Sequence, residues 1–502
     1  MNSQGIVKNR GFIDRFNLWN TEQSEAVEKI HAVIKEKGLR LIRVAWSDQH
    51  GISRAKTLTI PAFLGAMKNG IDFNTGPLFF DTANAIVYNP FMKGGGFDSD
   101  EMTGCPNYTL VPDPLTFKSL PWAEHTGWIL CDAYLKNGNP LPYDSRQICK
   151  KALKELNSIG YDLLSGLEVE FSLTKIVDDE IDASLLGAPG SPGQPPKVVP
   201  VARGYQYQLE AHNDEIDDIL QIIAENIQQL DLPLLTMEDE WGPSQLEFTF
   251  APMKGIDTAD TMLLFRTAVK QICKRHGYLA TFMCRPSIPG FFSSGWHLHQ
   301  SLIDINTGEN AFIPNNSDGP ISEIGQQFIA GILENARAAT VFTTPTVNGY
   351  KRFKPNSLAP DRAGWGLDNR GTMIRVIGGI EDDSLHFENR AGEPAANPYL
   401  YMASQILSGL DGIERKLQPG PLSTEAYNDN RPLLPKDLQS AVDSLKESEV
   451  FHNKMGTDFV NYIISMKESE INRYTTYVQE NNIEDYANIV TEWEHLEYFE
   501  IF

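Results

Sequence analysis

The sequence predicts an α+β protein with two domains. Its 502 residues exceed what a single ordinary hydrophobic core accommodates, so two domains are expected. Apolar runs of strand type alternate along the chain with amphipathic stretches of helical period. A helix with clear start signals follows residue 142, where we place the start of the second domain. We therefore expect a small domain over residues 1–142 and a larger one over residues 143–502.

The first domain is expected to begin with a helix. TEQSEAVEKIHAVIKEKG runs at helical period from Thr21, which we assign as the N-cap, to Gly38. LRLIRVAWSDQHG then has the pattern of a strand that ends in a turn. Residues 90–130 are rich in Gly, Pro and Asp and have no sustained helical period.

The second domain is expected to begin with LPYDSRQICKKALKELNSIG, which combines an Asp/Ser capping signal with a helical period. Residues 186–200 contain five prolines and three glycines, which predicts an exposed loop. NDEIDDILQIIAENIQQL follows as an amphipathic helix. The last residues, TEWEHLEYFEIF, have the pattern of an acidic, aromatic helix that packs on the domain.

Composition excludes some classes of protein. The chain has 43 basic and 66 acidic side chains, a formal net charge of −23, whereas nucleic-acid binding requires a basic surface. We therefore expect no nucleic-acid partner. Hydrophobic residues make up 41% and charged residues 22%, as in globular proteins. The excess of carboxylates is compatible with an enzyme that binds divalent cations but does not demonstrate one.

Cysteine usage and hydropathy predict a cytoplasmic protein. The five cysteines are odd in number, scattered and without a CxxC pair, which suits a reducing compartment. The first residues, MNSQGIVKNRGFIDRFNLWN, have no apolar segment of signal-peptide type. No stretch approaches the length of a membrane span, so we expect no membrane partner.

Two pairs of glutamates stand in apolar, strand-like surroundings. Glu168 and Glu170 in SGLEVEFSL are two residues apart, which places both carboxylates on one face of a strand. Glu240 and Glu247 flank a Gly-Pro turn and a strand in EDEWGPSQLEFTF. Ionised carboxylates side by side in an apolar wall repel each other and lose hydration, so a cation is expected to stabilise them. The solvent face of an edge strand would explain Glu168 and Glu170 equally well.

Two histidines have the same spacing as the first glutamate pair. His297 and His299 in FFSSGWHLHQSL both face one space if the segment is a strand. Half-buried, hydrogen-bonded histidines are the alternative for such a pair. Glu388 and Arg390 share a strand face in HFENRAGEPAANPYL. Several carboxylates with one imidazole suit Mg²⁺ or Mn²⁺ better than a closed zinc site, and two such ions could bind phosphate oxygens.

A basic cluster lies in NGYKRFKPNSLAPDRAGWGLDNRGTMIRV. Arg352, Arg370 and Arg375 occur here among Gly, Pro and Asn residues. Arginines in such segments commonly bind carboxylates or phosphates through paired N–H groups. A set of surface salt bridges is the alternative.

Taken in chain order, these segments resemble the motifs of the glutamine synthetase superfamily. The matching segments are DQHGISRAK, SGLEVEF, E-x-G-P-x-Q-x-E, G-x-H-x-H-x-S and NGYKR…DNRGTMIR, followed by E-x-R, NPYL and SGLDGIERKL. They cover most of residues 40–415. Each motif is weak alone, but their order and spacing together are specific. The γ-glutamylamide ligases are the branch that the chain resembles.

The resemblance implies a fold and an assembly. The fold is a small N-terminal β-grasp-like domain and a large catalytic domain with a curved antiparallel sheet. The assembly is a homo-oligomer, typically a dodecamer of two hexameric rings, in which neighbouring subunits share each active site. Asp48 matches the aspartate that a neighbouring subunit supplies to bind or deprotonate the amine.

The resemblance also implies two or more Mg²⁺ or Mn²⁺ ions in each site. One ion would be held by Glu170, Glu240 and Glu247. The second would lie against the phosphates of ATP, held by Glu168, His297 and Glu388.

The remaining site residues are carried over in the same way. His299 and Ser301 match nucleotide-contacting positions. Arg370 would face the transferred phosphoryl group, with Arg375 nearby on ATP. The carboxylate of a glutamate substrate would be bound by Arg352 and Arg390. In the implied reaction, ATP phosphorylates the side-chain carboxyl of glutamate, and an amine then displaces phosphate to leave a γ-glutamyl amide.

One departure from the glutamine synthetase pattern concerns the amine. Leu358 in PNSLAP matches a glutamate that attracts ammonium in glutamine synthetases. An ammonium ion beside leucine lacks a charged partner, a loss of roughly a few kcal/mol. Arylamines are largely neutral near neutral pH, so Leu358, with Trp365 in the same segment, favours an aromatic amine, as in a γ-glutamylanilide synthase. Alkylamine and polyamine ligases, or a divergent glutamine synthetase that uses ammonia, are the alternatives.

A catalytically silent structural or regulatory homologue is a further alternative, but all six expected metal ligands are present. Two other positions depart from the pattern. Phe292-Ser293 replaces an Asn-Gly pair that contacts glutamate in relatives, so the acid substrate is not settled by this motif. His386 stands where many relatives have an arginine near ATP.

Overall fold

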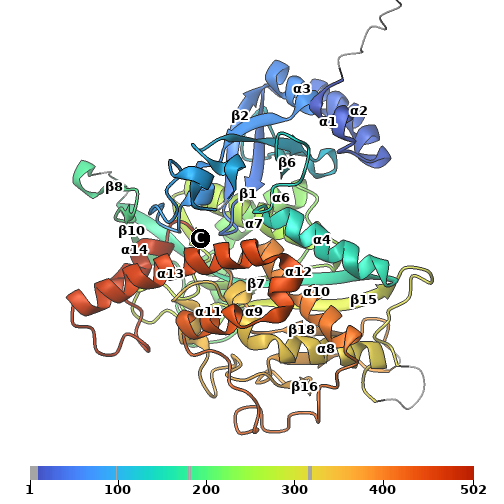
Figure 1. Cartoon of the computed structure of the whole chain (residues 1–502). Helices are drawn as coiled ribbons and strands as arrows, with labels where there is room; N and C mark the ends of the chain where they lie inside the picture. Colours follow the sequence, from blue (N-terminus) through green and yellow to red (C-terminus); the bar gives the residue numbers. More distant parts are fainter. Residues whose placement is uncertain (1–9, 98, 179, 181, 315–318, 381) are drawn as a thin grey trace, which may run out of the picture. The chain divides into compact units, whose positions relative to one another are not determined.

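The computed structural model describes residues 10–97, 99–178, 180, 182–314, 319–380 and 382–502 (Figure 1). The chain forms two compact units. The first consists of the residues up to Gln49, with Ser53–Phe79 and Tyr88–Gln147. The second consists of His50–Ile52, Phe80–Val87 and Ile148–Phe502. The two units therefore change over within helix α4 (Ser145–Ser158), and the boundary expected after residue 142 stays a prediction.

The first unit is built on a six-stranded mixed sheet with the order β2-β1-β6-β4-β3, in which β5 also pairs with β6. The strands β1 and β6 are parallel, and the other neighbours are antiparallel. The strands are β1 (Leu41–Ser47), β2 (Ser53–Thr59), β3 (Ile71–Asn74), β4 (Asn107–Pro112), β5 (Lys118–Ser119) and β6 (Thr126–Tyr134). The helices are α1 (Phe12–Phe16), α2 (Thr21–Glu36) and α3 (Ile60–Asn69), with the 3₁₀ turns η1 (Gly76–Phe79), η2 (Lys93–Gly96), η3 (Asp100–Met102) and η4 (Pro114–Thr116).

The first expected helix and strand are confirmed as α2 and β1, but the N-cap of α2 is Asn20 rather than Thr21. The Asn20 side chain accepts a hydrogen bond from the Gln23 N–H at 2.8 Å, and the Gln23 side chain accepts one from the Asn20 N–H at 3.0 Å. This reciprocal arrangement satisfies two N–H groups at the helix start, which Thr21 could not do from within the first turn.

The second unit contains a ten-stranded sheet with the order β11-β12-β7-β15-β18-β17-β16, and β10, β13 and β14 also pair with β7. Only β16 and β17 are parallel among its described neighbours, so the sheet expected to be antiparallel is mixed at one edge. The strands are β7 (Tyr161–Asp178), β10 (Lys197–Pro200), β11 (Leu234–Asp239), β12 (Gln245–Phe250), β13 (Met253–Lys254), β14 (Tyr278–Thr281), β15 (Trp296–Asp304), β16 (Trp365–Leu367), β17 (Ile374–Ile377) and β18 (His386–Asn389). A separate hairpin joins β8 (Gly187–Ala188) and β9 (Ser191–Pro192).

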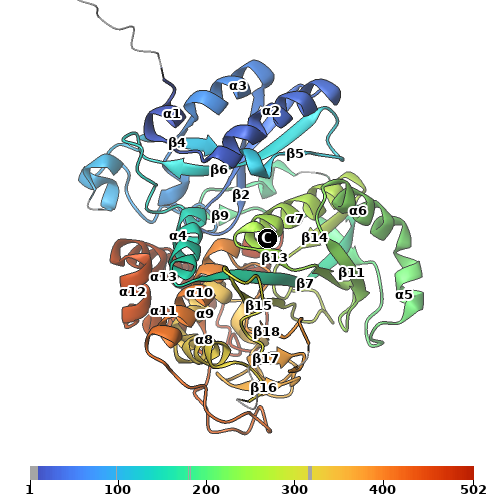
Figure 2. The ribbon, with the colours of Figure 1, turned by 90° about the vertical axis from the view of Figure 1, so that its right-hand side faces the viewer.

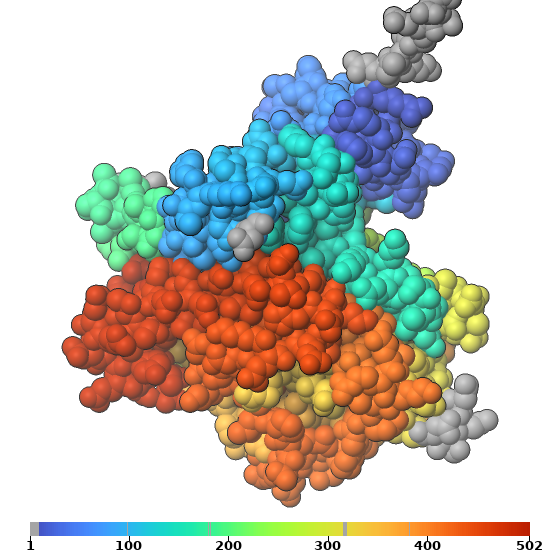
Figure 3. Space-filling view, in the orientation of Figure 1, coloured from blue at the N-terminus to red at the C-terminus, as the bar shows by residue number. Residues whose placement is uncertain are grey.

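Helices complete the second unit, and α8 to α12 gather beside one another in Figure 2. Helix α10 packs on α8 and α9, and α11 packs on α9 and α13. In Figure 3 the C-terminal segment, orange to red, forms most of the visible face of this unit. The helices are α5 (Glu210–Glu215), α6 (Asp217–Gln229), α7 (Asp257–Arg275), α8 (Glu323–Glu334), α9 (Ala336–Thr343), α10 (Pro398–Glu414), α11 (Leu438–Lys446), α12 (Glu449–Met455), α13 (Thr457–Glu480) and α14 (Glu492–Tyr498), with the 3₁₀ turns η5 (Ala183–Leu185) and η6 (Gly349–Arg352).

Two expectations for this unit are corrected in detail. The helix expected over residues 213–230 is divided into α5 and α6, because the backbone at Ile216 leaves helical geometry. The segment expected to be a loop, residues 186–200, ends in β10, whose N–H and C=O groups pair with the edge of the long strand β7. The α+β class itself is confirmed.

Side-chain alternation gives the central strands one apolar face and one polar face. Phe171 of β7 and Phe248 of β12 pack against Phe265 of α7, with ring centroids 6.1 and 5.7 Å from it. Each buried aromatic ring contributes about 1.5–3 kcal/mol to folding. With these residues directed into the core, alternate positions such as Glu168 and Glu247 must face the other side. No helix in the described parts of the chain combines the length and hydropathy needed to cross a bilayer.

Candidate active site

The candidate site is built on strand register. On β7, Glu168 lies opposite His297 of β15, and Glu170 lies opposite Glu247 of β12. On the other side of β15, His299 lies opposite Glu388 of β18. Directly opposed residues in adjacent strands share a face of the sheet. Four strands distant in the sequence therefore bring the predicted carboxylates and imidazoles together.

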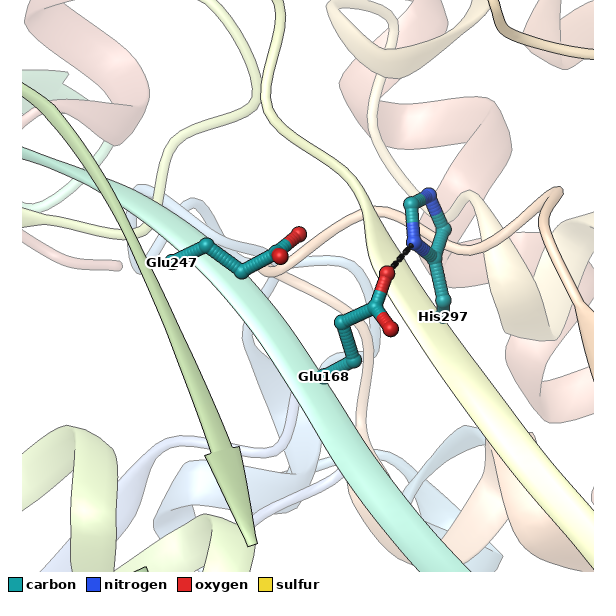
Figure 4. Close-up of side chains that lie close together, drawn as sticks. All are labelled: Glu168, Glu247 and His297. Atoms are coloured by element: carbon teal, nitrogen blue, oxygen red, sulfur yellow. Dashed lines mark hydrogen bonds and ion pairs between the residues drawn. The ribbon is translucent and has the colours of Figure 1, made fainter. Parts of the chain in front are cut away.

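Glu168 is the centre of this group. Its Oε1 contacts His297 Nδ1 in a short hydrogen bond, and its Oε2 lies 3.0 Å from His299 Nε2. Figure 4 shows the Glu247 carboxylate directed from β12 toward this pair. Glu168, Glu247 and His297 each offer a ligand atom within 4.8 Å of the others. The two-residue spacing thus lets both histidines donate hydrogen bonds to the same carboxylate, that of Glu168.

A second group of possible metal ligands shares Glu168. It consists of Glu168, His299 and Glu388, again within 4.8 Å of one another. His299 Nε2 lies 3.8 Å from Glu388 Oε2, and His297 Nδ1 lies 3.7 Å from the same oxygen. His299, expected as a nucleotide contact, therefore stands among the candidate metal ligands.

The grouping differs from the one expected from the sequence. Glu170 and Glu240 belong to neither group of three that the described residues form. His297 and His299 donate hydrogen bonds to Glu168 and hold it between them. Gln245 Nε2 holds Glu170 Oε2 at 2.9 Å, and the Trp241 N–H holds Glu240 Oε2 at 3.2 Å.

The carboxylates differ in how readily they ionise. Burial and the charges of Glu168 and Glu170 raise the pKa of Glu247 to about 11. Burial and the charge of Glu170 raise the pKa of Glu240 to about 8. For Glu168, burial opposes ionisation, but His297 and His299 outweigh it and hold the pKa well below its usual range. The site therefore combines an ionised carboxylate with two that keep a proton at neutral pH.

Glu388 is fully buried and ionised. Burial works against its charge, but His297 and Arg390 lower its pKa to about 2. Arg375 and Arg390 each donate a hydrogen bond to Glu388 Oε1 at 2.8 Å. The other oxygen, Oε2, is buried and has no hydrogen-bond partner in the part of the chain that the structure describes. This oxygen is the one directed toward both histidines.

These donors fit a divalent cation. Carboxylate oxygens with one or two imidazoles match the ligand preference of Mn²⁺ and, with fewer imidazoles, of Mg²⁺. The buried Glu388 Oε2 has no hydrogen-bond partner among the described residues, and a cation bound beside it would supply the missing partner. The two groups of three share Glu168.

The arginines predicted to bind substrates border the same carboxylates. Arg352 donates to the Arg390 carbonyl at 2.8 Å and contacts His297 Nε2 at 3.1 Å. Arg375 also binds Asp368. Arg390 Nε is buried and has no hydrogen-bond partner among the described residues. Arg370 is exposed.

Arg352 is held in place by the C-terminal tail, a role that the sequence did not reveal. In α14, Glu494 accepts a hydrogen bond from Asn348 Nδ2 at 2.8 Å and forms a short ion pair with Lys351. Lys351 Nζ also donates to the Ile489 carbonyl at 2.6 Å. The tail thus packs as expected, and its buried ion pair fixes the turn η6 that ends at Arg352.

The other predicted residues lie as follows. Ser301 is buried on β15, opposite Leu164 of β7. His386 Nε2 contacts His299 Nδ1 at 2.9 Å, so it borders the site as its position suggested. In the first unit, Asp48 is buried and its carboxylate accepts from Arg54 Nε at 2.8 Å.

The residues predicted for an amine pocket differ in accessibility. Leu358 is 51% exposed, whereas Trp365 is 3% exposed and donates its indole N–H to the Gly420 carbonyl at 3.1 Å. Leu358 has a left-handed backbone, φ 60°, and its carbonyl accepts from Arg390 at 3.2 Å. Such a conformation is unfavourable for leucine, so the Arg390 contact helps to hold it. Leu358, not Trp365, offers surface to a ligand.

Gln245 is a site residue that motif reasoning did not assign. Besides Glu170, its Nε2 contacts Ser294 Oγ at 3.0 Å, and its Oε1 accepts from the Gly242 N–H at 2.9 Å. It therefore connects the Gly-Pro turn after Glu240 to β7 and to the segment before His297. Gln245 is the glutamine of the E-x-G-P-x-Q-x-E pattern, and this position in the motif could have identified it as a site residue.

Comparison with known proteins agrees with this arrangement. The family model described as glutamine synthetase, catalytic domain, matches residues 142–486. A γ-glutamylanilide synthase of Acinetobacter sp is 46% identical over 98% of this chain and 99% of its own. A glutamate–isopropylamine ligase of Pseudomonas sp is 31% identical over 93% of this chain and 99% of its own. A solved GmaS/ADP complex is 25% identical with a TM-score of 0.72, covering 92% of this chain and 97% of that one.

Replacing Glu168 tests the shared ligand. A cation that binds only the folded protein at 100 times its Kd stabilises it by about 2.7 kcal/mol. We expect Mn²⁺ or Mg²⁺ to raise the Tm of the wild type and Glu168→Gln to lose most of that rise, measured by thermal unfolding. Glu225→Gln, an exposed change on α6, is the control and should keep the full rise. An undiminished rise in Glu168→Gln would contradict the assignment.

Metal binding is also expected to release protons. At pH 7 the raised pKa values of Glu240 and Glu247 leave both carboxyls protonated in the metal-free protein, and a bound cation displaces those protons. Apparent affinity should therefore increase as the pH rises from 6 to 8. Calorimetric titration in two buffers of different ionisation enthalpy measures the release. Heats that do not depend on the buffer would show that no proton leaves.

Proposed function

The chain belongs to the glutamine synthetase family, and from this premise we propose that it uses ATP to join the γ-carboxyl of glutamate to an organic amine. It is an ATP-dependent ligase of that family. The observation that carries the proposal is the 46% identity, over nearly the whole of both chains, with the Acinetobacter γ-glutamylanilide synthase. Aniline-like amines are therefore the substrates we favour.

The reaction needs ATP because a carboxylate is a poor acyl donor. A γ-carboxylate oxygen of glutamate bonds to the γ-phosphorus of ATP, and ADP leaves with the bridging oxygen. The amine nitrogen then bonds to the carbon of the γ-carboxyl group, the bond from that carbon to the phosphate oxygen breaks, phosphate leaves and the nitrogen loses a proton. The protein contributes by positioning the reactants and by neutralising charge on the moving phosphoryl group.

The glutamate site is proposed at Arg352 and Arg390. The Arg352 side chain donates a hydrogen bond to the backbone carbonyl of Arg390. The Arg352 guanidinium therefore lies beside the base of the Arg390 side chain. The unpartnered, buried Nε of Arg390 supports this assignment, because a substrate carboxylate would supply the acceptor that it lacks.

The nucleotide site is proposed along β15 and β17. His299 and Ser301 of β15, with Arg375 of β17 and the exposed Arg370, would contact ATP. Bound Mg²⁺ or Mn²⁺, two or more per site, would supply positive charge against the phosphate oxygens. The residues proposed to hold these ions are Glu168, Glu170, Glu240, Glu247, His297 and Glu388.

We also propose a shared active site in a homo-oligomer, a dodecamer of two hexameric rings. Asp48 of a neighbouring subunit would then bind the amine or take its proton. Its ion pair with Arg54 would hold the carboxylate in one orientation for that task. The five cysteines, scattered and without a CxxC pair, support a reducing location, and we propose the cytoplasm.

Leu358 supports an apolar amine. Its half-exposed side chain projects from a loop whose backbone contacts Arg390, one of the arginines proposed to bind glutamate. A leucine there offers an apolar surface but no counter-charge for ammonium. The similarity to the Pseudomonas glutamate–isopropylamine ligase keeps a small alkylamine as the second candidate.

The first test measures phosphate release from ATP and Mg²⁺ with glutamate and four amines at equal concentration. The amines are ammonium, isopropylamine, putrescine and aniline. We expect aniline to stimulate release most and ammonium least, with γ-glutamylanilide detected as the product. Highest activity with ammonium would make the chain a divergent glutamine synthetase, and highest activity with putrescine would indicate a polyamine ligase.

A second test changes Leu358. We expect Leu358→Glu to raise kcat/KM for ammonium about tenfold, because a nearby carboxylate stabilises the cation by roughly 1–2 kcal/mol. The same change should lower kcat/KM for aniline. Leu358→Met keeps an apolar side chain of similar volume and is the control. Parallel changes for both amines in Leu358→Glu would show that the residue does not select between them.

A further inference from the structure

A pair of stacked aromatic side chains next to the site has no role in the reaction described so far. The rings of Tyr207 and Trp241 lie 5.1 Å apart between centroids and are parallel within 3°. Each side chain is 43% exposed. Large aromatic groups usually bury their faces, so a rigid, half-exposed stack offers apolar surface to a partner.

Backbone contacts fix the stack beside Glu240. The Tyr205 N–H donates to the Trp241 carbonyl, and the Gln208 N–H donates to the Asp239 carbonyl, both at 3.3 Å. The segment around Tyr207 therefore lies along the turn that follows β11. Trp241 directly follows Glu240, and its own N–H donates to the Glu240 carboxylate. The rings and the candidate metal ligands thus share one rigid turn.

A third exposed aromatic residue borders the same turn. Phe292 is 51% exposed, and its Cβ lies 3.1 Å from where a Cβ on Gly242 would be. Gly242 thus permits the close approach of the Phe292 segment to the turn that carries Trp241. Phe292 is also the residue that replaces the asparagine of the family pattern. Aromatic residues from three segments therefore lie at or next to the Gly-Pro turn.

We propose that Tyr207 and Trp241 form the surface that binds the aromatic ring of the amine substrate, with Phe292 at its border. This inference rests on the proposed function and deepens it, because it assigns residues to amine selection. An arylamine brings a flat apolar ring, which stacks on aromatic faces and gains about 0.5–1.5 kcal/mol beyond area burial.

Strand register favours the amine over the adenine of ATP as the occupant. Along β7, the proposed nucleotide contacts Ser301 and His299 lie opposite Leu164 and Gly166. The candidate metal ligands follow at the levels of Glu168 and Glu170. Gln245, at the end of the turn that carries Trp241, lies opposite Ser172. The turn that carries the stack is therefore beyond the candidate metal ligands, on the side away from His299 and Ser301.

The test compares Trp241→Leu with Trp241→Phe in the full-length enzyme. Leucine removes the stacking face, so we expect KM for aniline to rise about tenfold while KM for ATP, KM for glutamate and KM for isopropylamine change less than about twofold. Phenylalanine restores a ring and should keep KM for aniline within about twofold. Tyr486→Leu, an exposed tyrosine near the C-terminus, is the matched control and should behave as the wild type.

The outcomes separate this inference from the proposed function. A wild type that forms no γ-glutamylanilide contradicts the proposed function itself. A wild type that forms it, with an unchanged KM for aniline in Trp241→Leu, overturns the inference alone. A rise confined to KM for ATP would place adenine on the stack, and a loss of oligomer mass in light scattering would make it a subunit contact. Either of these results would also overturn the inference.

Discussion

The candidate site depends on how the charge of Glu388 is neutralised. This carboxylate is completely buried, and its Oε1 accepts hydrogen bonds from both Arg375 and Arg390. Removing one partner of a buried ion pair costs about 3–5 kcal/mol, so these contacts are strong constraints on geometry. Arg390 in turn contacts the backbone of the loop that carries Leu358. One buried charge thus connects β17, β18 and the loop proposed to select the amine.

The same carboxylate lies near both His297 and His299, which their two-residue spacing places on one face of β15. Arginines bind one oxygen of Glu388, and its other oxygen, Oε2, is directed at His297 and His299. Both histidines also bind Glu168, which brings β7 and β15 into the same network. The imidazoles therefore lie between two carboxylates.

The C-terminal tail has a structural task in this arrangement. Glu494 is buried, and the positive charge of Lys351 and the amide of Asn348 compensate it. Because Lys351 immediately precedes Arg352, the tail determines where one of the proposed glutamate-binding arginines starts. The position of Arg352 and the packing of the last helix are thereby linked through one buried ion pair.

Residue spacing alone determined much of this protein. The two-residue periods at Glu168/Glu170 and His297/His299 placed each pair on one strand face, because strand side chains alternate whatever the surrounding fold. The helix over residues 21–36 and the strand that follows it were likewise predictable from the local residue pattern. The N-cap at Asn20 and the break at Ile216 were not predictable in this way, because the ends of helices depend on hydrogen bonds formed only in the folded chain.

Long-range pairing decided the rest. No local pattern states that Glu168 faces His297 or that His299 faces Glu388, because strand register is set by packing of both faces of the sheet. The grouping of metal ligands around Glu168, the role of Glu494 and the stack of Tyr207 on Trp241 all join segments far apart in sequence. Local spacing therefore predicted the candidate carboxylates and histidines and the strand face that each pair shares. Which of these side chains meet depends on register and charge compensation across the sheet, and only the folded chain shows it.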